Sequence, residues 1–324
     1  MKYPNRRTFV KSISSLAAGA TLLPVSSYAS IKPLTIPKRT LGKTGEKVSI
    51  LTMGGFHVGH PDVPEEEGVR IIRRAIDGGV NMMDNAWTYH KGRAETVMGK
   101  ALKDGYRDKV VLMTKFTART LDEIKKQLEE SLSRFELDRF DIMQFHAVGN
   151  KNDDVDNIFN NNLIEWAEEQ RSQGVFRYIG FTGHADPKAH IRMIQSGYPW
   201  DTTQMPINIG DYHRNVSFEK DVLPLCIEKE IGVFAMKSNG MGHLKKSGIA
   251  TPVEGLRYSM SQPVSTVVSG IDSMDILDEN MAAFHNFTPL SDQEKAEFLA
   301  RAEGQSDKIE KYRRQLYDKD KKLI

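Results

Sequence analysis

The sequence predicts a (β/α)8 barrel, or TIM barrel, with a β-hairpin before it and a helical extension after it. Short apolar runs alternate with amphipathic segments eight times along the chain, and eight such units in about 240 residues match the usual size of this barrel. The apolar runs are almost unbroken, as expected for a parallel sheet that helices cover on the outside. The turn after the first strand lacks the GxGxxG pattern typical of the competing fold, a doubly wound sheet. The barrel is therefore favoured over that sheet.

The eight units follow one another from Val48 to Phe284. In the helix expected at 121–135, Ile124, Leu128, Leu132 and Phe135 recur every three or four residues, which places them on one face. The expected strands are 48–53, 80–86, 110–116, 140–148, 178–182, 203–209, 233–237 and 264–270. The expected helices are 66–77, 94–103, 121–135, 163–173, 188–195, 221–230, 254–260 and 276–284.

Two further segments flank these units. Residues 39–49 read as a tight hairpin with glycine-containing turns, and we expect it to close the bottom of the barrel. Residues 289–324 are highly charged with mixed signs, and we expect a helical C-terminal extension that covers one rim. The barrel domain thus spans 30–288, and no second domain is expected.

The first 29 residues read as an export signal. They hold Arg6 and Arg7 among four basic residues and no acidic one. An apolar run and the small-x-small motif at 27–29 follow. The adjacent arginines, with Phe9 and Lys11 behind them, resemble a twin-arginine signal; an ordinary secretory signal is the alternative. We expect export to the periplasm, with the twin-arginine translocation machinery as a transient partner.

Composition excludes several classes of protein. With 45 Lys+Arg against 43 Asp+Glu the net charge is +2, so no basic excess indicates a nucleic-acid partner. A single cysteine excludes an intramolecular disulfide framework and a Cys-bound iron–sulfur cluster. No apolar stretch reaches the roughly 18 residues of a membrane span. The spacings of the nine histidines match no common zinc motif, and no metal is expected.

Three consecutive strands each end on a polar residue of the same parity. Asp84, Lys115 and His146 share a face with otherwise mostly apolar residues of their strands, because strand side chains alternate. In a barrel the functional groups lie at the C-terminal ends of the strands. If these faces point inward, the three side chains meet at the mouth, and Tyr89 in the next loop reaches over them.

These four residues would form a proton-transfer unit. An ammonium close to a tyrosine hydroxyl favours the ionised phenolate and lowers the tyrosine pKa. Asp84 would hold Lys115 charged, and a neutral His146 could donate a second hydrogen bond to the substrate oxygen. Taken singly, the Lys–Asp pair could be structural and the histidine a packing residue. The argument for function depends on the set.

The same residues resemble the aldo/keto reductase family. Asp84-Asn85-Ala86-Trp87-Thr88-Tyr89 followed by Arg93-Ala94-Glu95 is similar to its Asp-x-Ala-x-x-Tyr…Glu signature. The strands ending in Lys115 and His146 fall where that family has its catalytic Lys and His. The resemblance implies a hydride transfer between nicotinamide and a small carbonyl or alcohol, with Tyr89 as general acid. Polar loop residues such as His57, Trp87, Asn208 and His213 favour a hydroxylated, sugar- or polyol-like substrate over a steroid. The resemblance extends over residues 39–283.

The resemblance also implies sites for NAD(P)(H). Gln204 matches the family's usual residue, whereas Thr182 and Met236 stand in for a Ser-Asn pair and a stacking Tyr. The implied cofactor residues are Thr182, Gln204, Met236, Lys237, Gly270, Asp272, Glu279 and Asn280. Asp272 and Asp275, with no Lys or Arg from 271 to 280, would repel a 2′-phosphate, which favours NAD(H) or a relaxed preference.

His57 and Trp87 are the candidate substrate contacts. Some motifs, such as Gly183-His184-Ala185-Asp186-Pro187, resemble members that carry a Cys-rich ferredoxin-like tail, which this sequence lacks. Two alternatives to a reductase stay open. A nucleotide-loaded binding or regulatory barrel would show little turnover, and a phosphate-binding isomerase barrel would leave the four mouth residues unexplained.

Overall fold

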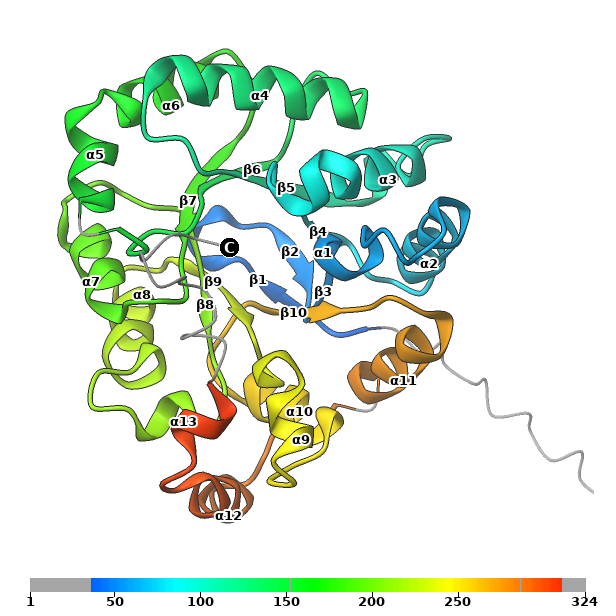
Figure 1. Cartoon of the computed structure of the whole chain (residues 1–324), viewed down its shortest axis with the longest axis vertical. Coiled ribbons are helices and arrows are strands. Elements are labelled where there is room, and N and C mark those ends of the chain that lie inside the picture. Colours follow the sequence, from blue (N-terminus) through cyan, green and yellow to red (C-terminus); the bar gives the residue numbers. More distant parts are fainter. Residues whose placement is uncertain (1–35, 152, 286, 311–324) are drawn as a thin grey trace, which may run out of the picture. The chain divides into compact units, whose positions relative to one another are not determined.

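The structure is a computed structural model, and it describes residues 36–151, 153–285 and 287–310. The predicted signal at 1–29 and the last part of the predicted extension, 311–324, lie outside the described residues. Eight parallel strands close into a barrel in the order β10-β3-β4-β5-β6-β7-β8-β9 (Figure 1). The prediction of a (β/α)8 barrel is therefore confirmed, and the doubly wound sheet is excluded.

Each barrel strand is short and is followed by a helix of the outer layer. The strands are β3 (Leu51–Gly54), β4 (Met82–Asp84), β5 (Val111–Phe116), β6 (Ile142–Phe145), β7 (Tyr178–Thr182), β8 (Thr202–Pro206), β9 (Gly232–Met236) and β10 (Thr266–Gly270). The covering helices are α2 (Glu65–Asp77), α3 (Arg93–Ala101), α4 (Leu121–Phe135), α6 (Leu163–Ser172), α7 (Pro187–Gln195), α8 (Leu223–Glu228), α10 (Pro252–Ser261) and α11 (Met274–His285). Shorter helices α1 (Gly55–Val58), α5 (Asp154–Asn160) and α9 (His243–Lys246) lie in the connections.

The first predicted strand is in fact two. Residues 47–49 form β2, which pairs antiparallel with β1 (Lys38–Thr40), and the barrel strand begins only at Leu51. Residues 48–53 are all buried and contain no glycine or proline, so the sequence does not show this corner. Strand β6 is also shorter than the predicted 140–148, so that His146 directly follows it.

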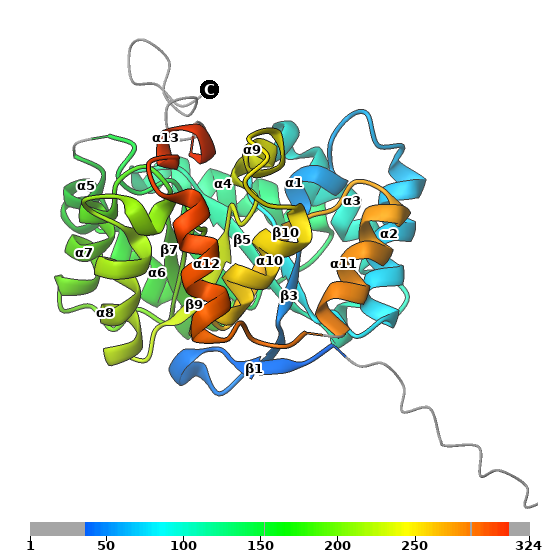
Figure 2. The ribbon, with the colours of Figure 1, turned by 90° about the horizontal axis from the view of Figure 1, so that it is seen from below.

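The predicted hairpin closes one end of the barrel. Leu41 and Val48 are fully buried against Met82 and Phe234 from inside the barrel. Gly42 makes this approach possible: its φ is +49°, and a Cβ there would lie 2.3 Å from the Glu230 carbonyl oxygen. Figure 2 shows β1 at the lower end of the barrel, opposite α9 and α13 (Ser306–Ile309).

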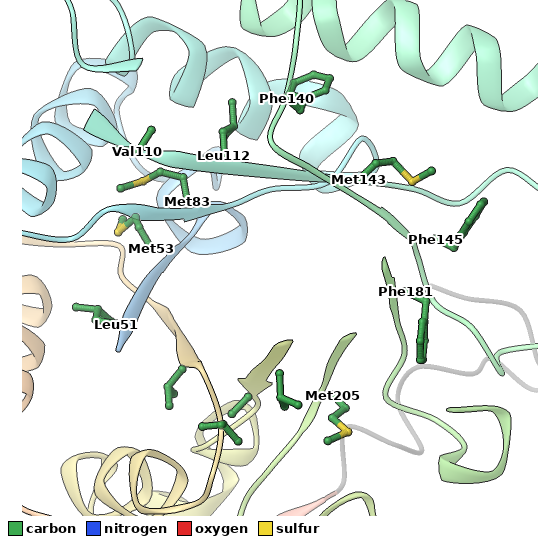
Figure 3. Close-up of a cluster of buried hydrophobic side chains, with 14 of the residues drawn as sticks. Leu51, Met53, Met83, Val110, Leu112, Phe140, Met143, Phe145, Phe181 and Met205 are labelled. Carbon is green, nitrogen blue, oxygen red and sulfur yellow. The ribbon is translucent and has the colours of Figure 1, made fainter. Parts of the chain in front are cut away.

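Alternation along the strands divides the core into two apolar clusters. Met82, Met113 and Ile142 belong to the cluster inside the barrel, so the predicted inward faces are confirmed. Met83, Leu112, Met143 and Phe145 have the opposite parity and pack between the strands and the helices (Figure 3). Inside the barrel, the cluster fills the half next to the hairpin and leaves the other half to polar side chains.

The described part of the C-terminal extension is helical, as predicted. Helix α12 (Asp292–Ala302) begins with a capping box between Ser291 and Glu294. Helix α13 lies over the loops that follow β8 and β9: Ser306 Oγ donates to the Gly210 carbonyl at 2.7 Å, and buried Ile309 packs on Gly210 and Gly240. Every helix in the described residues is too short or too polar to traverse a lipid bilayer.

Candidate active site

The ends of β4 and β5 bring a buried ion pair to the centre of the barrel. Lys115 Nζ donates to Asp84 Oδ1 and, at 2.6 Å, to the Asn85 carbonyl. The side chains of Lys115 and Asp84 are only 1% and 3% exposed. Gln204 on β8 donates to the second Asp84 oxygen at 3.4 Å. The pair is thus held by three strands.

Tyr89 reaches this pair from the loop after β4. Lys115 Nζ donates to the Tyr89 hydroxyl oxygen at 3.4 Å. The next two residues, His90 and Lys91, have φ values of +51° and +56°, a left-handed conformation that costs a non-glycine residue about 1 kcal/mol or more. A contact of 2.7 Å between His90 Nε2 and the Phe56 carbonyl oxygen helps to fix the turn.

His146 completes the group from the end of β6. Its ring lies edge-on to the ring of Tyr89, with the centroids 5.8 Å apart. Burial, and then the charge of Lys115, lower the pKa of His146 well below its usual value. The imidazole is therefore neutral at pH 7, and its Nδ1 has no hydrogen-bond partner among the described residues. The structure thus brings Asp84, Lys115 and His146 together, as their parity predicts, and places the loop residue Tyr89 beside them.

The electrostatics differ from the sequence expectation at one residue. Burial alone would lower the pKa of Lys115, but Asp84 and then Tyr89 outweigh it and the pKa is raised. Burial raises the pKa of Tyr89 above its usual value, and Lys115 opposes this. The expected direction of the Lys115 effect is right, but the expected net lowering is wrong because loss of phenolate solvation is the larger effect. Tyr89 is protonated at neutral pH and can donate a proton.

The side chain of Trp87 is held by helix α4. Its indole Nε1 donates to Glu130 Oε2 on α4 at 2.7 Å, and the Arg134 guanidinium lies 5.5 Å from the ring centroid. The indole packs against the outer cluster between strands and helices. The indole N–H is therefore taken by Glu130, a contact that the sequence did not indicate, and a substrate contact through the rest of the Trp87 ring stays a prediction.

Buried polar atoms without partners surround the mouth near the predicted cofactor residues. Gln204 Oε1 and Ser238 Oγ have no hydrogen-bond partner in the described part of the chain, and both residues are nearly fully buried. Thr182 and Met236 are also buried, at the ends of β7 and β9. An amide oxygen and a hydroxyl group that lack hydrogen-bond partners suit a ligand that carries an amide group and anionic oxygens. The residues present therefore fit a nicotinamide nucleotide.

Four more of the predicted cofactor residues lie between the end of β10 and the middle of helix α11: Gly270, Asp272, Glu279 and Asn280. His57 lies against Gly270, where a Cβ would come within 2.3 Å of its Nδ1, and Asp272 is close enough to act on the pKa of His57. His57 is thus beside the predicted cofactor residues. Asp272 and Glu279 are exposed, whereas Asn280 is buried and donates to Ser269 Oγ at 3.0 Å. The Asn280 amide keeps its oxygen and its second N–H for a ligand, since an amide nitrogen carries two donors.

Three site neighbours were not found from the sequence. Phe56 is 42% exposed and lies edge-on to Tyr89 at 5.2 Å; its place at the end of the first barrel strand was the available signal. Asn85 supplies a carbonyl to Lys115. Arg119 donates to the His146 carbonyl at 2.7 Å, a contact with no signature in the sequence. No three His, Cys, Asp or Glu residues group as metal ligands within the described ranges.

Fold and site together define a (β/α)8 barrel whose mouth gathers a buried Lys–Asp pair, a tyrosine and a neutral histidine. A model of the aldo/keto reductase family matches residues 50–253, and the chain belongs to that family. Its members are oxidoreductases. The resemblance noted in the sequence is thereby confirmed.

Named relatives agree with this assignment. L-galactose dehydrogenase from Arabidopsis thaliana is 27% identical in a match of length 300 that covers 80% of this chain and 92% of the plant protein. The holo form of aldo-keto reductase AKR11C1 from Bacillus halodurans has a TM-score of 0.69 at 24% identity, covering 82% of this chain and 96% of that one. An aldo-keto reductase from Klebsiella pneumoniae, solved in complex with NADPH, has a TM-score of 0.68 at 21% identity over 81% and 94% of the two chains. These structures share the fold.

Proposed function

We propose that the protein is an oxidoreductase that uses NAD(P)(H) to interconvert a small carbonyl compound and its alcohol, with Tyr89 as general acid and base. A bound nicotinamide supplies or accepts the hydride. The chain's own residues position the substrate oxygen and move its proton. One observation carries the proposal: the ammonium of Lys115 donates both to Asp84 and to the Tyr89 hydroxyl in a water-poor barrel mouth.

In the reducing direction, protonated Tyr89 donates its proton to the oxygen of the carbonyl group. The positive charge of Lys115 stabilises the phenolate that remains, since an adjacent ammonium favours the charged form of tyrosine. Neutral His146 donates a second hydrogen bond to the same oxygen and so orients the carbonyl. Asp84 keeps Lys115 charged, which the raised pKa of Lys115 supports.

Thr182, Gln204 and Met236 would hold the nicotinamide end of the cofactor, and the turn at 237–240 its pyrophosphate. We infer a preference for NAD(H), or no strong preference. Asp272 and Asp275 are both exposed at the start of α11, where they would repel a 2′-phosphate. The Klebsiella pneumoniae relative was solved with NADPH, which supports a nicotinamide nucleotide, NAD(H) or NADP(H), as the cofactor of this chain. Separate titrations with NADH and NADPH measure the preference.

A sugar- or polyol-like substrate is the proposed class. The relative named L-galactose dehydrogenase supports it. We also propose that residues 1–29 direct export by the twin-arginine route, which transports folded proteins and would let the cofactor bind before export.

Tyr89→Phe tests the proposed chemistry. Removal of the hydroxyl deletes the proton donor, and loss of general acid catalysis lowers kcat by about 10²–10⁴-fold. Binding of NADH or NADPH, followed by quenching of tryptophan fluorescence, should persist. Tyr106→Phe is the matched control, because Tyr106 bonds to Asp77 far from this group.

The alternative is a nucleotide-loaded binding barrel with little turnover. It predicts that the wild type binds nucleotide but reduces no carbonyl in a broad panel, so that Tyr89→Phe changes nothing. Full activity in Tyr89→Phe would refute the role of Tyr89. Absence of nucleotide binding in folded, nucleotide-free protein would refute the oxidoreductase assignment.

A further inference from the structure

The turn after β6 carries His146 and has an unusual backbone. The His146 amide donates to the carbonyl of Phe116, the last residue of β5, at 2.8 Å. The next residue, Ala147, has a φ of +61°, a conformation that costs a non-glycine residue about 1 kcal/mol or more. The His146 carbonyl accepts from a side chain instead of from a neighbouring strand. The sheet alone therefore does not hold this turn.

Arg119, in the loop after β5, supplies the contact to the His146 carbonyl. Its Nη2 donates to that oxygen at 2.7 Å. Its Nη1 donates to the carbonyls of Thr117 and Ala118 at 3.0 and 3.1 Å. One guanidinium thus joins the backbone after β5 to the backbone after β6, and its planar arrangement of donors fixes how the two lie relative to each other.

Helix α5 in turn holds Arg119. The Nε atom lies 3.3 Å from Asp154 Oδ1, and the two side chains are only 12% and 5% exposed. Asn161, directly after α5, donates through Nδ2 to the Arg119 carbonyl at 2.6 Å. Asp154 compensates the positive charge, and backbone carbonyls engage both Nη atoms. The guanidinium is therefore directed at the protein's own backbone.

The charge of Arg119 also favours the neutral imidazole of the proposed chemistry. Burial is the largest cause of the lowered pKa of His146. Four neighbours on β5 and in the loops after β5, β7 and β9 lower it further: Lys115, His184, Arg119 and Lys237. Arg119 thus acts on His146 through its charge as well as through the hydrogen bond.

We propose that Arg119 is a positioning residue for His146: it fixes the turn after β6 and thereby the direction in which the imidazole meets the substrate oxygen. Without Arg119 the carbonyl would lose its donor, and relief of the left-handed φ at Ala147 would favour a shift of that peptide. The ring extends from the same Cα and would be displaced with it. The inference rests on the proposed oxidoreductase function, in which His146 orients the carbonyl group of the substrate.

A mutant cycle with His146→Gln tests the proposal. Arg119→Met/Asp154→Asn removes the guanidinium without leaving a buried carboxylate unpaired. At saturating nucleotide and substrate it should lower kcat about 10–100-fold, since a misplacement of about 1 Å costs up to about 10²-fold. In the His146→Gln background the same change should alter kcat by about twofold at most, because no imidazole remains to be positioned. The Kd of NADH or NADPH should stay unchanged throughout.

Two further variants serve as controls. Arg171→Met/Asp201→Asn removes a comparable pair, 2.8 Å apart, that lies beside the start of β8 and so at the hairpin end of the barrel. It should leave kcat unchanged in both backgrounds. Arg119→Lys keeps a charge beside Asp154 in case the first variant does not fold. One ammonium lacks the planar set of donors, so this variant should also lower kcat, by about tenfold, and only while His146 is present.

Three results would overturn the proposal. The first is wild-type kcat in the folded Arg119→Met/Asp154→Asn variant or, if that variant does not fold, in Arg119→Lys. The second is an equal loss of kcat with and without His146, since Arg119 would then act independently of the imidazole. The third is an unchanged kcat with an about tenfold weaker Kd for the nucleotide, which would assign Arg119 to the cofactor site.

A measurement on the ring itself separates this proposal from the proposed function. In nucleotide-free protein with histidine labelled at 13Cε1, the His146 signal is identified by its absence in His146→Gln. Its relaxation reports the ps–ns mobility of the ring without turnover. A displaced or more mobile ring in the Arg119 variants, and not in the Arg171 control, supports the proposal even if the wild type reduces no carbonyl. A signal unchanged in both chemical shift and relaxation would overturn it even if the enzyme is active.

Discussion

Replacing Lys115 by methionine tests how the buried pair contributes to stability apart from catalysis. Methionine keeps the length of the side chain and removes its charge. The Asp84 carboxylate, 3% exposed, would then keep only the 3.4 Å hydrogen bond from Gln204, and the Asn85 carbonyl would lose a donor at 2.6 Å. An uncompensated buried charge is the main consequence.

Removal of one partner of a buried ion pair costs about 3–5 kcal/mol, and we expect a loss of this size in the free energy of unfolding at pH 7. Lys115→Met/Asp84→Asn removes the second charge as well and keeps the shape of the carboxyl group. The double variant should therefore be more stable than the single one by about 2 kcal/mol or more, because no charge is left buried. Each replacement alone would also abolish activity, so activity cannot make this distinction.

The sign of the pH effect follows from Asp84. Burial raises the pKa of Asp84, and Lys115 normally opposes this. Without Lys115 the carboxyl binds a proton more tightly in the folded than in the unfolded chain. The free energy of unfolding of Lys115→Met should therefore rise as the pH falls from 7 towards 5, while the double variant shows no such gain.

Urea unfolding at pH 7 and pH 5 measures these differences, with tryptophan fluorescence and far-UV circular dichroism as independent probes that must coincide. The reasoning is refuted if Lys115→Met and Lys115→Met/Asp84→Asn unfold at the same urea concentration at pH 7. It is also refuted if Lys115→Met is as stable as the wild type, since the pair would then contribute nothing to the fold.

Two further predictions concern residues away from the mouth. Gly42→Ala would bring a Cβ within 2.3 Å of backbone atoms of Glu230 and Gly232 at a φ of +49°, and in urea unfolding it should cost more than about 2 kcal/mol. Gly45→Ala, with a φ of +78° and open space around it, should cost only about 1 kcal/mol; equal losses would contradict the close packing of the hairpin. Arg134→Met removes the cation 3.0 Å from the fully buried Glu95 carboxylate and should destabilise by about 3 kcal/mol at pH 7, less at pH 5 because burial raises the pKa of Glu95. Glu95→Gln/Arg134→Met should recover part of that loss, and a double variant less stable than Arg134→Met would argue against a charge effect.

The part of the site that lies on strands could be predicted, because a side chain on a strand can point to only one of two faces. Once Met82, Met113 and Ile142 are assigned to the inside, parity places Asp84, Lys115 and His146 inside as well. The closed barrel then brings neighbouring strand ends together without further information. Element boundaries were predicted less accurately: the corner at Ile50 lies in a buried segment, 48–53, that contains no glycine or proline to mark it.

Loop-borne side chains could not be predicted in the same way. Trp87 follows Asp84 by three residues, yet its direction is decided by Glu130 on α4, a residue 43 positions further along the chain. The net pKa shift of Tyr89 depends on how completely the folded chain removes water, which the sequence does not state. The contact between α13 and the Gly210 and Gly240 loops likewise depends on tertiary packing alone.

The same strands line an apolar interior at one end of the barrel and a polar interior at the other. At the hairpin end, Leu41, Val48 and Phe234 fill the interior with apolar atoms, and this packing supplies stability without polar groups that need partners. At the mouth, Gln204 Oε1, Ser238 Oγ and His146 Nδ1 are buried without partners in the described chain, and each such atom costs about 1–3 kcal/mol. A ligand that satisfies them regains this free energy on binding. The same three atoms that make the mouth unfavourable in the free chain therefore favour a polar ligand there, and the apolar packing below lets the fold tolerate them.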